Sequence, residues 1–352
     1  MTKFPYQASS RQSLTDSKVL RSQFGEFDSV KITEIDTSGY SGAKFSKMNL
    51  AYSDGKKIDL ILKRMNLDDD WFSSRSNDVH GREAKAILSG ELSHIHHLFE
   101  LPYHIISIEE RNIGILMNDI SSGLFPDEKK SIHQADQDLM LDKLAEMHAY
   151  YWESQILDSL TWLNRSEDFI YLMGPLDHEE NKQRSSKNLQ QSVETGWESA
   201  MKLLPEKIKN IFLLPASNIL DRWSDLPLTL IHGDSKVANF AKSENGQLCL
   251  FDWAFVGHAP CTFELGWFLG VNASRLAESK EELLLKYRKM LEKHLGHSID
   301  NLLWSRLEEA GIVCGAFMLL WSKGAAVANN QEGAVKEWNW WLQRLENWAK
   351  NF

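Results

Sequence analysis

The spacing of apolar residues changes partway along the chain, and this change constrains the fold more than any other feature. Between residues 27 and 65 apolar and polar side chains alternate, as in the run from Val30 to Ile35, and turns interrupt the pattern twice. A period of two is typical of strands with one buried face, so this region predicts three antiparallel strands. Between Gln134 and Trp152 the apolar residues recur instead at the spacing of a helix. We therefore expect an α+β fold that begins as a sheet and continues as helices.

Further patterns complete both parts. Residues 81–92 have helical spacing, and short apolar runs at residues 103–108 and 113–117 bring the antiparallel sheet to about five strands, a common size. A connector rich in serine and glycine follows the last run. At this length two lobes are favoured over one core. The predicted division is an N-terminal lobe at residues 1–117 and a mainly helical C-terminal lobe at residues 118–352.

Two segments of the helical lobe allow alternatives. The polar stretch 177–192 is consistent with a solvated helix or with a mobile insert. Near the end of the chain Trp338, Trp341, Leu345 and Trp348 are spaced by three and four residues, which places them on one face of a helix. We expect this face to be buried core, and the alternative is that it forms part of a substrate pocket.

Composition excludes several classes of protein. The formal net charge of −10 provides no basic surface for a nucleic-acid backbone, so we expect no nucleic-acid partner. The three cysteines form no paired motif that would indicate disulfides or a zinc site. The apolar stretch Ala310–Trp321 is shorter than the ~20 residues of a membrane span, and the N-terminus has no secretory pattern. We expect a cytoplasmic monomer or homodimer without a membrane partner.

The segment with the clearest chemistry is a polar loop held between apolar runs. Residues Leu228–Phe240 form an apolar run followed by a loop with Asp234 and Asn239, and a second apolar run ends at Asp252. Phosphoryl transfer needs a metal that neutralises the phosphates and a group that holds the attacking hydroxyl. A carboxylate and an amide oxygen suit magnesium, and a second carboxylate can accept the hydroxyl's hydrogen bond. These three side chains supply the three groups.

This segment resembles the aminoglycoside phosphotransferase and choline kinase superfamily, whose members share the protein-kinase fold. The family motif H-G-D-x-x-x-x-N matches the loop from His232 to Asn239, and its second motif matches the Phe-Asp-Trp around Asp252. The resemblance implies that Asp234 is the catalytic aspartate, that Asn239 and Asp252 bind Mg²⁺, and that His232 supports the loop. It also implies a two-lobed, protein-kinase-like fold with ATP as phosphate donor.

Three charged residues extend the resemblance. Lys63 closes an apolar predicted strand, where the kinase-like fold places the lysine that contacts the α- and β-phosphates, and Glu83 lies where its partner glutamate is expected. A single lysine or glutamate is usually a solvated charge, but a lysine that ends an apolar strand is less easily explained in this way. Lys236 follows the catalytic aspartate by two residues, where a cation would offset charge on the transferred phosphate.

The remaining nucleotide contacts involve the backbone. The glycine-containing turn with Gly39, Ser41 and Gly42 resembles the loop that covers the phosphates, although an ordinary hairpin turn also uses such residues. In the resembling family the residues that leave the last strand of the first lobe offer backbone groups to adenine. The nearest candidates in this chain are Met117 and Asn118.

Three other features are weaker indicators. Residues 144–152 resemble the L-A-x-x-H-A-x-x-W signature of the choline-kinase-like and ecdysteroid-kinase-like branches, in which His148 is expected to be a buried support for the catalytic loop. Glu264 stands where the family has an aspartate, which leaves the geometry of that loop open. The histidines of residues 94–97 are expected to form a surface patch and not a metal site.

The sequence thus predicts an ATP- and magnesium-dependent kinase that phosphorylates a hydroxyl group of a small molecule. Its acceptor would be a choline-like amino alcohol, an aminosugar or a related compound. The abundant aromatic residues favour an amino alcohol because aromatic faces attract quaternary ammonium groups, although these residues fit a buried core equally well. The alternative is a catalytically silent, nucleotide-binding regulatory module with the same fold.

Overall fold

A computed structural model describes residues 5–36, 42–126, 130–176, 187–243, 245–350 and 352. The chain forms two compact units. The first contains residues up to Leu124 together with the segment Phe240–Ala254, and the second contains most of the remaining chain. The division at residue 117 that the sequence predicts stays a proposal.

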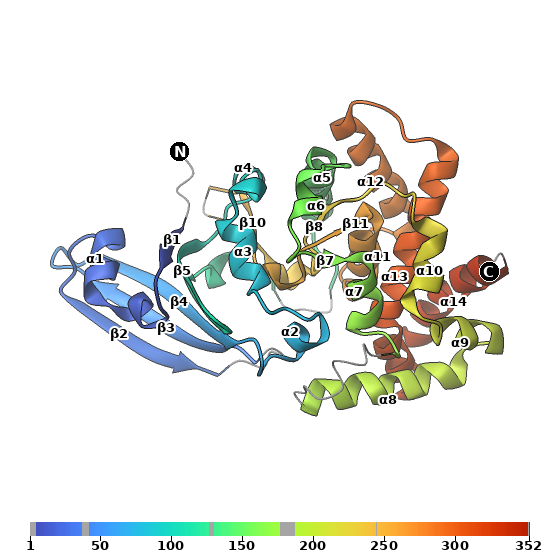
Figure 1. Cartoon of the computed structure of the whole chain (residues 1–352), viewed down its shortest axis with the longest axis horizontal. Helices are drawn as coiled ribbons and strands as arrows, with labels where there is room; N and C mark the ends of the chain where they lie inside the picture. Colours follow the sequence, from blue (N-terminus) through green and yellow to red (C-terminus); the bar gives the residue numbers. More distant parts are fainter. Residues whose placement is uncertain (1–4, 37–41, 127–129, 177–186, 244, 351) are drawn as a thin grey trace. The chain divides into compact units, whose positions relative to one another are not determined.

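The first unit is built on a six-stranded sheet in the order β1-β5-β6-β4-β3-β2 (Figure 1). All neighbouring strands pair antiparallel except β1 and β5, which are parallel. The five predicted strands are confirmed, and the sixth was missed. The strands are β1 (Tyr6–Ala8), β2 (Ser29–Ile35), β3 (Lys44–Ala51), β4 (Lys57–Asn66), β5 (Tyr103–Glu109) and β6 (Asn112–Asn118).

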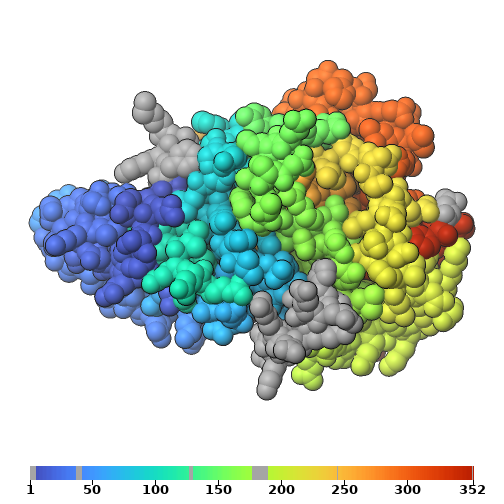
Figure 2. Space-filling model, in the orientation of Figure 1, coloured from blue at the N-terminus to red at the C-terminus, as the bar shows by residue number. Residues whose placement is uncertain are grey.

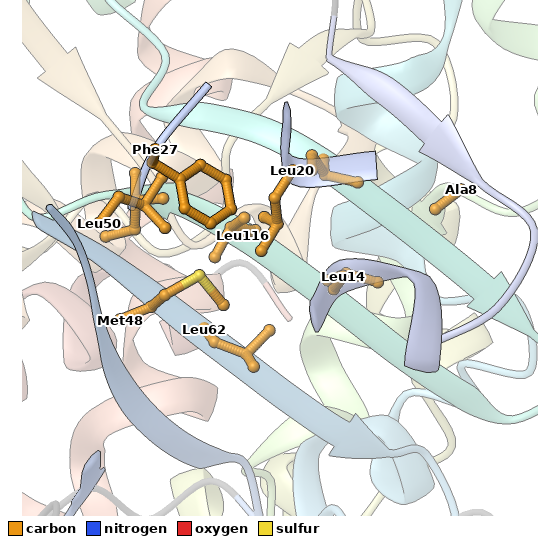
Figure 3. Close-up of a cluster of buried hydrophobic side chains, with 10 residues drawn as sticks. Ala8, Leu14, Leu20, Phe27, Met48, Leu50, Leu62 and Leu116 are labelled. Carbon is orange, nitrogen blue, oxygen red and sulfur yellow. The ribbon is translucent and has the colours of Figure 1, made fainter. Parts of the chain in front are cut away.

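One face of this sheet is covered by the N-terminal residues. The helix α1 (Ser17–Phe24) and the turn Gln12–Thr15 bury Leu20 and Leu14 against strand residues such as Met48 and Leu62 (Figure 3). Burial of such aliphatic side chains stabilises a fold by about 1.5 to 3 kcal/mol each. This cluster is one of the cores of the first unit.

Short helices and a hairpin complete the first unit. The predicted helix at residues 81–92 is shorter in the structure, because α3 ends at Leu88 and a 3₁₀ turn follows. The hairpin of β9 and β10 belongs to this unit and leads to Asp252. The helices and hairpin strands are α2 (Trp71–Arg75), α3 (Arg82–Leu88), α4 (Ile95–Leu98), β9 (Phe240–Lys242) and β10 (Leu248–Leu250).

The second unit is mainly helical, as predicted, and carries a small three-stranded sheet in the order β7-β11-β8. Helix α12 lies at the surface of this unit (orange in Figure 2). The elements are α5 (Gln134–Tyr150), α6 (Ile156–Ser159), β7 (Asn164–Arg165), α7 (Ser166–Leu172), α8 (Lys187–Leu203), α9 (Glu206–Phe212), α10 (Ala216–Leu220), β8 (Thr229–Ile231), β11 (Gly257–Ala259), α11 (Cys261–Val271), α12 (Lys280–Leu295), α13 (Asn301–Ala328) and α14 (Ala334–Lys350).

Helix α13 is the central helix of this unit and packs against α8, α11 and α14. The predicted apolar stretch is part of this helix of 28 residues, which by length and composition could cross a membrane, but 67% of its most apolar window is buried inside the protein. Its crossing with α11 is close because both helices have glycine there: a Cβ on Gly266 would lie 1.9 Å from the carbonyl oxygen of Gly311. The two glycines thus fix the position of α11, a helix that contributes residues to the candidate active site.

Of the two segments that allowed alternative interpretations, the structure decides one fully and the other in part. Residues 177–186 lie outside the described part of the chain, and α8 begins at Lys187, so the alternatives for the polar stretch are decided only for its last residues. On α14 the predicted face of Trp338, Trp341, Leu345 and Trp348 is buried, each side chain being 5% exposed or less. The interpretation of this face as core is therefore confirmed.

Candidate active site

Lys63 lies in the middle of the sheet of the first unit, on β4 between β3 and β6. Its side chain is buried, and its Nζ atom lies 2.7 Å from Oε2 of Glu83 on α3 and 3.0 Å from Oδ1 of Asp252. The contacts join residues that are 20 and 189 positions apart in the sequence. The pair of Lys63 and Glu83 that the resemblance implies is therefore present, and Asp252 adds a second carboxylate.

The charge of this lysine is stabilised by its neighbours. Burial disfavours the ammonium ion, but the negative charges of Asp252 and Glu83 and the hydrogen bonds to them outweigh burial and hold the pKa of Lys63 above its ordinary value. The lysine is a cation at neutral pH. A buried cation needs such partners, since an unpaired one costs several kcal/mol.

Tyr103, which the sequence analysis did not identify, links the two carboxylate residues. Its hydroxyl donates to Oε1 of Glu83 over 3.2 Å and accepts from the backbone N–H of Asp252 over 3.1 Å. Asp252 itself has a positive φ of 65°, which is uncommon for a residue other than glycine and is often found at functional sites. Tyr103 begins β5 and gives no sequence signal that separates it from an ordinary core tyrosine.

The predicted nucleotide-backbone contacts are only partly within the described residues. Gly39 and Ser41 lie outside them. The N–H of Gly42 donates to Oδ1 of Asp70 over 3.0 Å, so this amide is engaged by a carboxylate. Met117 is buried in β6, and the N–H of Asn118 at its end donates to the Pro102 carbonyl over 2.8 Å. Adenine recognition by these residues remains a prediction. The backbone N–H of Asn118 already has a hydrogen-bond partner in the Pro102 carbonyl.

The predicted catalytic loop lies in the second unit and follows β8. Asp234 is 6% exposed, and each of its carboxylate oxygens has a donor. Oδ2 accepts from Nδ2 of Asn239 over 2.9 Å and from Nζ of Lys236 over 2.8 Å, whereas Oδ1 accepts from the indole N–H of Trp267 over 3.0 Å. The structure thus brings Asp234, Lys236 and Asn239 together.

The orientation of Asn239 is set by a second bond to the same residue. Its Nδ2 also donates to the backbone carbonyl of Asp234 over 2.8 Å, so the amide nitrogen faces the aspartate and the amide oxygen is left as the acceptor. Lys236 is about one-third exposed at its side chain, and its ammonium pairs with the Asp234 carboxylate. A neutral donor and a cation thus share one carboxylate oxygen.

The base of the catalytic loop is held by Glu264, the residue that departs from the family pattern. Its carboxylate accepts from the backbone N–H of His232 over 2.7 Å and from that of Gly233 over 3.0 Å. His148 Nε2 lies 3.1 Å from the same carboxylate and His148 Nδ1 lies 2.5 Å from the Tyr287 hydroxyl. His148 is therefore the buried support of the loop that was expected, and the glutamate binds both loop amides.

Two further residues, Trp267 on α11 and Asn272 directly after it, contact the loop and were missed by the sequence analysis. Trp267 donates to Asp234 as described, and Asn272 at the end of the helix binds the loop backbone twice, as acceptor from Val237 N–H at 2.8 Å and as donor to the Ser235 carbonyl at 3.2 Å. Together with Glu264 these residues follow one another along α11 and directly after it. Only the apolar sequence around them signalled a buried helix, and nothing indicated which residues face the loop.

The histidines of residues 94–97 form no metal site among the described residues, where no cluster of three or more histidine, cysteine, aspartate or glutamate ligands occurs. The prediction of a surface patch is wrong for His96. This ring is buried and its Nε2 lies 3.1 Å from the Ile87 carbonyl, because α4 turns it toward α3. His97 is exposed, and His94 lies between the two extremes.

The aromatic residues of α14 already have a cation beside them. Nζ of Lys280 lies 4.2 Å from the ring centre of Trp340 and 5.3 Å from that of Trp341, and it forms an ion pair with Glu337 at 2.5 Å. Burial lowers the pKa of Lys280 to about 8, against the opposing effect of Glu337. The tryptophans of this helix therefore provide no support for a quaternary ammonium acceptor.

Part of the chain is similar to a known protein family. Residues 130–295 match the model of the phosphotransferase enzyme family, a segment that includes the catalytic loop and Asp252. No curated protein sequence matches the chain. A choline kinase from Cryptosporidium parvum has a similar fold, with a TM-score of 0.51, 13% identity and coverage of 95% of each chain.

Two other solved structures are similar at lower TM-scores. A Plasmodium vivax ethanolamine kinase gives 0.49 at 15% identity, covering 94% of this chain and 86% of that chain. A choline kinase from Streptococcus pneumoniae gives 0.44 at 14% identity, covering 96% and 100%. At these identities the likeness concerns the fold, which is the α+β, kinase-like fold expected from the sequence. Residues 130–295 of this chain are thus similar to the phosphotransferase enzyme family.

Proposed function

We propose that this chain transfers the γ-phosphate of ATP to a hydroxyl group of a small molecule, with magnesium as the metal. The observation that carries the proposal is Lys63, a buried lysine held between Glu83 and Asp252 on the sheet of the first unit. Lys63 itself is buried, whereas the side chain of Asp252 beside it is 35% exposed, so one side of this charge cluster is open to solvent. The arrangement suits a cation that is kept charged and aimed at phosphate oxygens.

The catalytic loop supports the second half of the proposal. Asp234 presents a carboxylate with a hydrogen-bond donor on each oxygen, and these bonds orient the side chain. A hydroxyl of the acceptor would donate a hydrogen bond to this carboxylate. As the hydroxyl oxygen forms its bond to the γ-phosphorus, the bond to the β,γ-bridging oxygen breaks, ADP leaves, and the hydroxyl proton passes to Asp234.

Lys236 would act on the transferred group. Its ammonium lies against Asp234, and its exposure allows it to turn toward a phosphate that carries more charge. We propose that the lysine leaves the carboxylate when the phosphate binds. This exchange would release Oδ2 of Asp234 for the acceptor.

The donor set fits magnesium. Asn239 offers an amide oxygen and Asp252 a carboxylate, and hard oxygen ligands of this kind are what Mg²⁺ takes when phosphates and water complete its shell. Magnesium bound through these residues would neutralise negative charge on the triphosphate. The assignment of Asn239 and Asp252 as its ligands rests on the motif spacing and on the orientation of the Asn239 amide.

The acceptor is proposed as a hydroxyl compound without a further restriction to choline. The cation that lies over Trp340 and Trp341 is the chain's own Lys280, so these aromatic faces are engaged. Aminosugars, amino alcohols and related compounds stay as candidates. The catalytically silent module is disfavoured because Lys63, Asp234, Asn239 and Asp252 are all retained in ordered contacts.

The proposal is tested by ADP release from ATP and magnesium against a panel of hydroxyl compounds. At least one compound should stimulate release, and the stimulation should disappear when magnesium is chelated. A thermal shift measurement runs in parallel: ATP with magnesium should raise the unfolding midpoint of the wild type and raise it less for Asp252→Ala. A raised midpoint without stimulation by any compound would instead support the silent module.

A further inference from the structure

The indole of Trp267 makes the one contact to the Asp234 carboxylate that comes from outside the catalytic loop among the described residues. Lys236 and Asn239 are two and five positions away in the sequence, whereas Trp267 lies on α11, 33 positions away. The indole has one donor and no acceptor. It can therefore hold an oxygen of Asp234 in place but cannot take the proton of an acceptor hydroxyl.

The two carboxylate oxygens of Asp234 differ in what surrounds them. Oδ2 is shared by an ammonium and an amide, both of which belong to residues with a proposed role toward phosphate or metal. Oδ1 is held by Trp267, which is 5% exposed and packs edge-to-face on Phe255 with ring centres 6.4 Å apart. The partners of Oδ2 can change when substrates bind, while the partner of Oδ1 is fixed by its packing.

The helix that carries Trp267 is itself fixed to the loop at both sides of this contact. Glu264, three residues earlier, binds the loop amides at His232 and Gly233. Asn272, five residues later, binds the loop backbone at Ser235 and Val237. These bonds set the loop backbone relative to α11, so the Trp267 indole meets the carboxylate at a defined rotamer. None of the backbone bonds can orient the side chain of Asp234.

We propose that Trp267 is a positioning residue that selects the rotamer of the Asp234 carboxylate for phosphoryl transfer. This inference rests on the proposed function, in which Asp234 receives the hydrogen bond of the acceptor. A neutral donor suits the role because it orients the carboxylate without neutralising it as a lysine or arginine would. The acceptor hydroxyl then approaches the side of Oδ2, where Lys236 and Asn239 also point.

The test compares Trp267→Phe with Trp223→Phe. Trp223 is a matched control: it is buried in the same unit, and its indole N–H donates to Oε1 of Glu309 over 3.3 Å, away from the catalytic loop. Both substitutions remove one indole–carboxylate bond of a buried tryptophan, and both remove the same volume. Thermal unfolding of both variants reports the shared structural cost.

Turnover is measured as ADP release from ATP and magnesium, with water alone and with the hydroxyl compound that stimulates the wild type most. Trp267→Phe should lower kcat by about 10- to 100-fold and leave KM for ATP nearly unchanged. A misplaced carboxylate destabilises the transition state of phosphoryl transfer more than it weakens nucleotide binding. Trp223→Phe should keep kcat within about twofold of the wild type. Equal kcat for both variants, while Asp234→Ala is inactive, would overturn the positioning role of Trp267 and leave the proposed function in place.

A second readout does not depend on turnover. In protein labelled with ¹⁵N-indole tryptophan, the Trp267 signal is identified by its loss in Trp267→Phe. Asp234→Ala should move this indole proton signal upfield, because a charged acceptor is removed, and should leave the Trp223 signal in place. An unmoved Trp267 signal would contradict the contact itself. Full turnover in Asp234→Ala with a moved signal would instead contradict the proposed function, and with it the role of Trp267 in it.

Discussion

The Nε2 atom of His148 lies 3.1 Å from Oε2 of Glu264, with both side chains buried in the second unit. His148 comes from α5 and Glu264 from α11, so this contact joins two helices beneath the catalytic loop. The glutamate also accepts from two loop amides. The loop is therefore held by a buried carboxylate whose charge matters for stability.

The charge of Glu264 makes stability depend on pH. Burial alone would raise its pKa, but the hydrogen bond and charge of His148, with the bond from the His232 backbone, hold the pKa of Glu264 below its ordinary value. A carboxyl whose pKa is lowered by folding contributes stability that is present above pH 4.5 and is lost as the pH falls through its folded value. We predict that Glu264→Gln lowers the free energy of unfolding at pH 7 by about 1.5 to 3 kcal/mol.

The measurement for Glu264 is urea unfolding of both proteins at pH 7 and at pH 4. The difference between wild type and Glu264→Gln should shrink at the lower pH, because pH 4 lies below the ordinary pKa of a glutamate, where the unfolded chain takes up the proton and the stabilisation by the folded carboxylate starts to be lost. Other carboxyl groups titrate equally in both proteins and cancel in the comparison. A difference that stays constant between the two pH values would contradict the assignment.

Lys63 provides a prediction about the first unit. Lys63→Met removes the cation between Glu83 and Asp252 and leaves a buried glutamate without its ion pair, which should cost about 3 to 5 kcal/mol of unfolding free energy. Lys47→Met is the control, since Lys47 bridges Asp59 and Asp119 at the surface with its side chain 38% exposed. Surface pairs contribute about 0 to 1 kcal/mol. Similar losses in both variants, by urea unfolding, would show that the pair at Lys63 is not buried.

Gly233 tests the turn before the catalytic aspartate. Its φ of +81° disfavours other residues, and a Cβ there would lie 2.4 Å from the Phe255 carbonyl oxygen. Gly296 has a similar φ of +77° but open space around it, so Gly296→Ala measures the backbone cost alone, about 1 kcal/mol. Gly233→Ala should lower the thermal unfolding midpoint clearly more than Gly296→Ala. Equal shifts would indicate that the turn relaxes without a clash.

The sequence predicted much of the architecture because the relevant signals are local. The alternating burial of β3 and the amphipathic α14 follow from the spacing of apolar residues. Strand β1 was missed because three residues carry no periodicity, and its parallel pairing with β5 is a tertiary contact. The full length of α13 was also hidden, because a helix buried on most sides lacks a polar face.

The residues of the candidate site were likewise predicted where the signal is local and missed where it depends on tertiary packing. Asp234, Asn239 and Asp252 were found because motif spacing along one segment encodes them. Trp267 and Tyr103 were missed because each reaches the site from another element through packing, and a buried aromatic residue looks the same in sequence whether or not its polar atom holds a carboxylate. His96 was misplaced for a related reason, since its burial depends on how α4 meets α3.

The central claim is that Asp234 orients the acceptor hydroxyl, and the most direct test is turnover of Asp234→Asn. This variant keeps the size of the side chain but loses the negative charge, and ADP release in the presence of the stimulating compound should fall by at least ~100-fold. Asp225→Asn, which alters a surface pair with Arg306, should keep the wild-type rate. An Asp234→Asn protein that releases ADP as fast as the Asp225→Asn control would contradict the account.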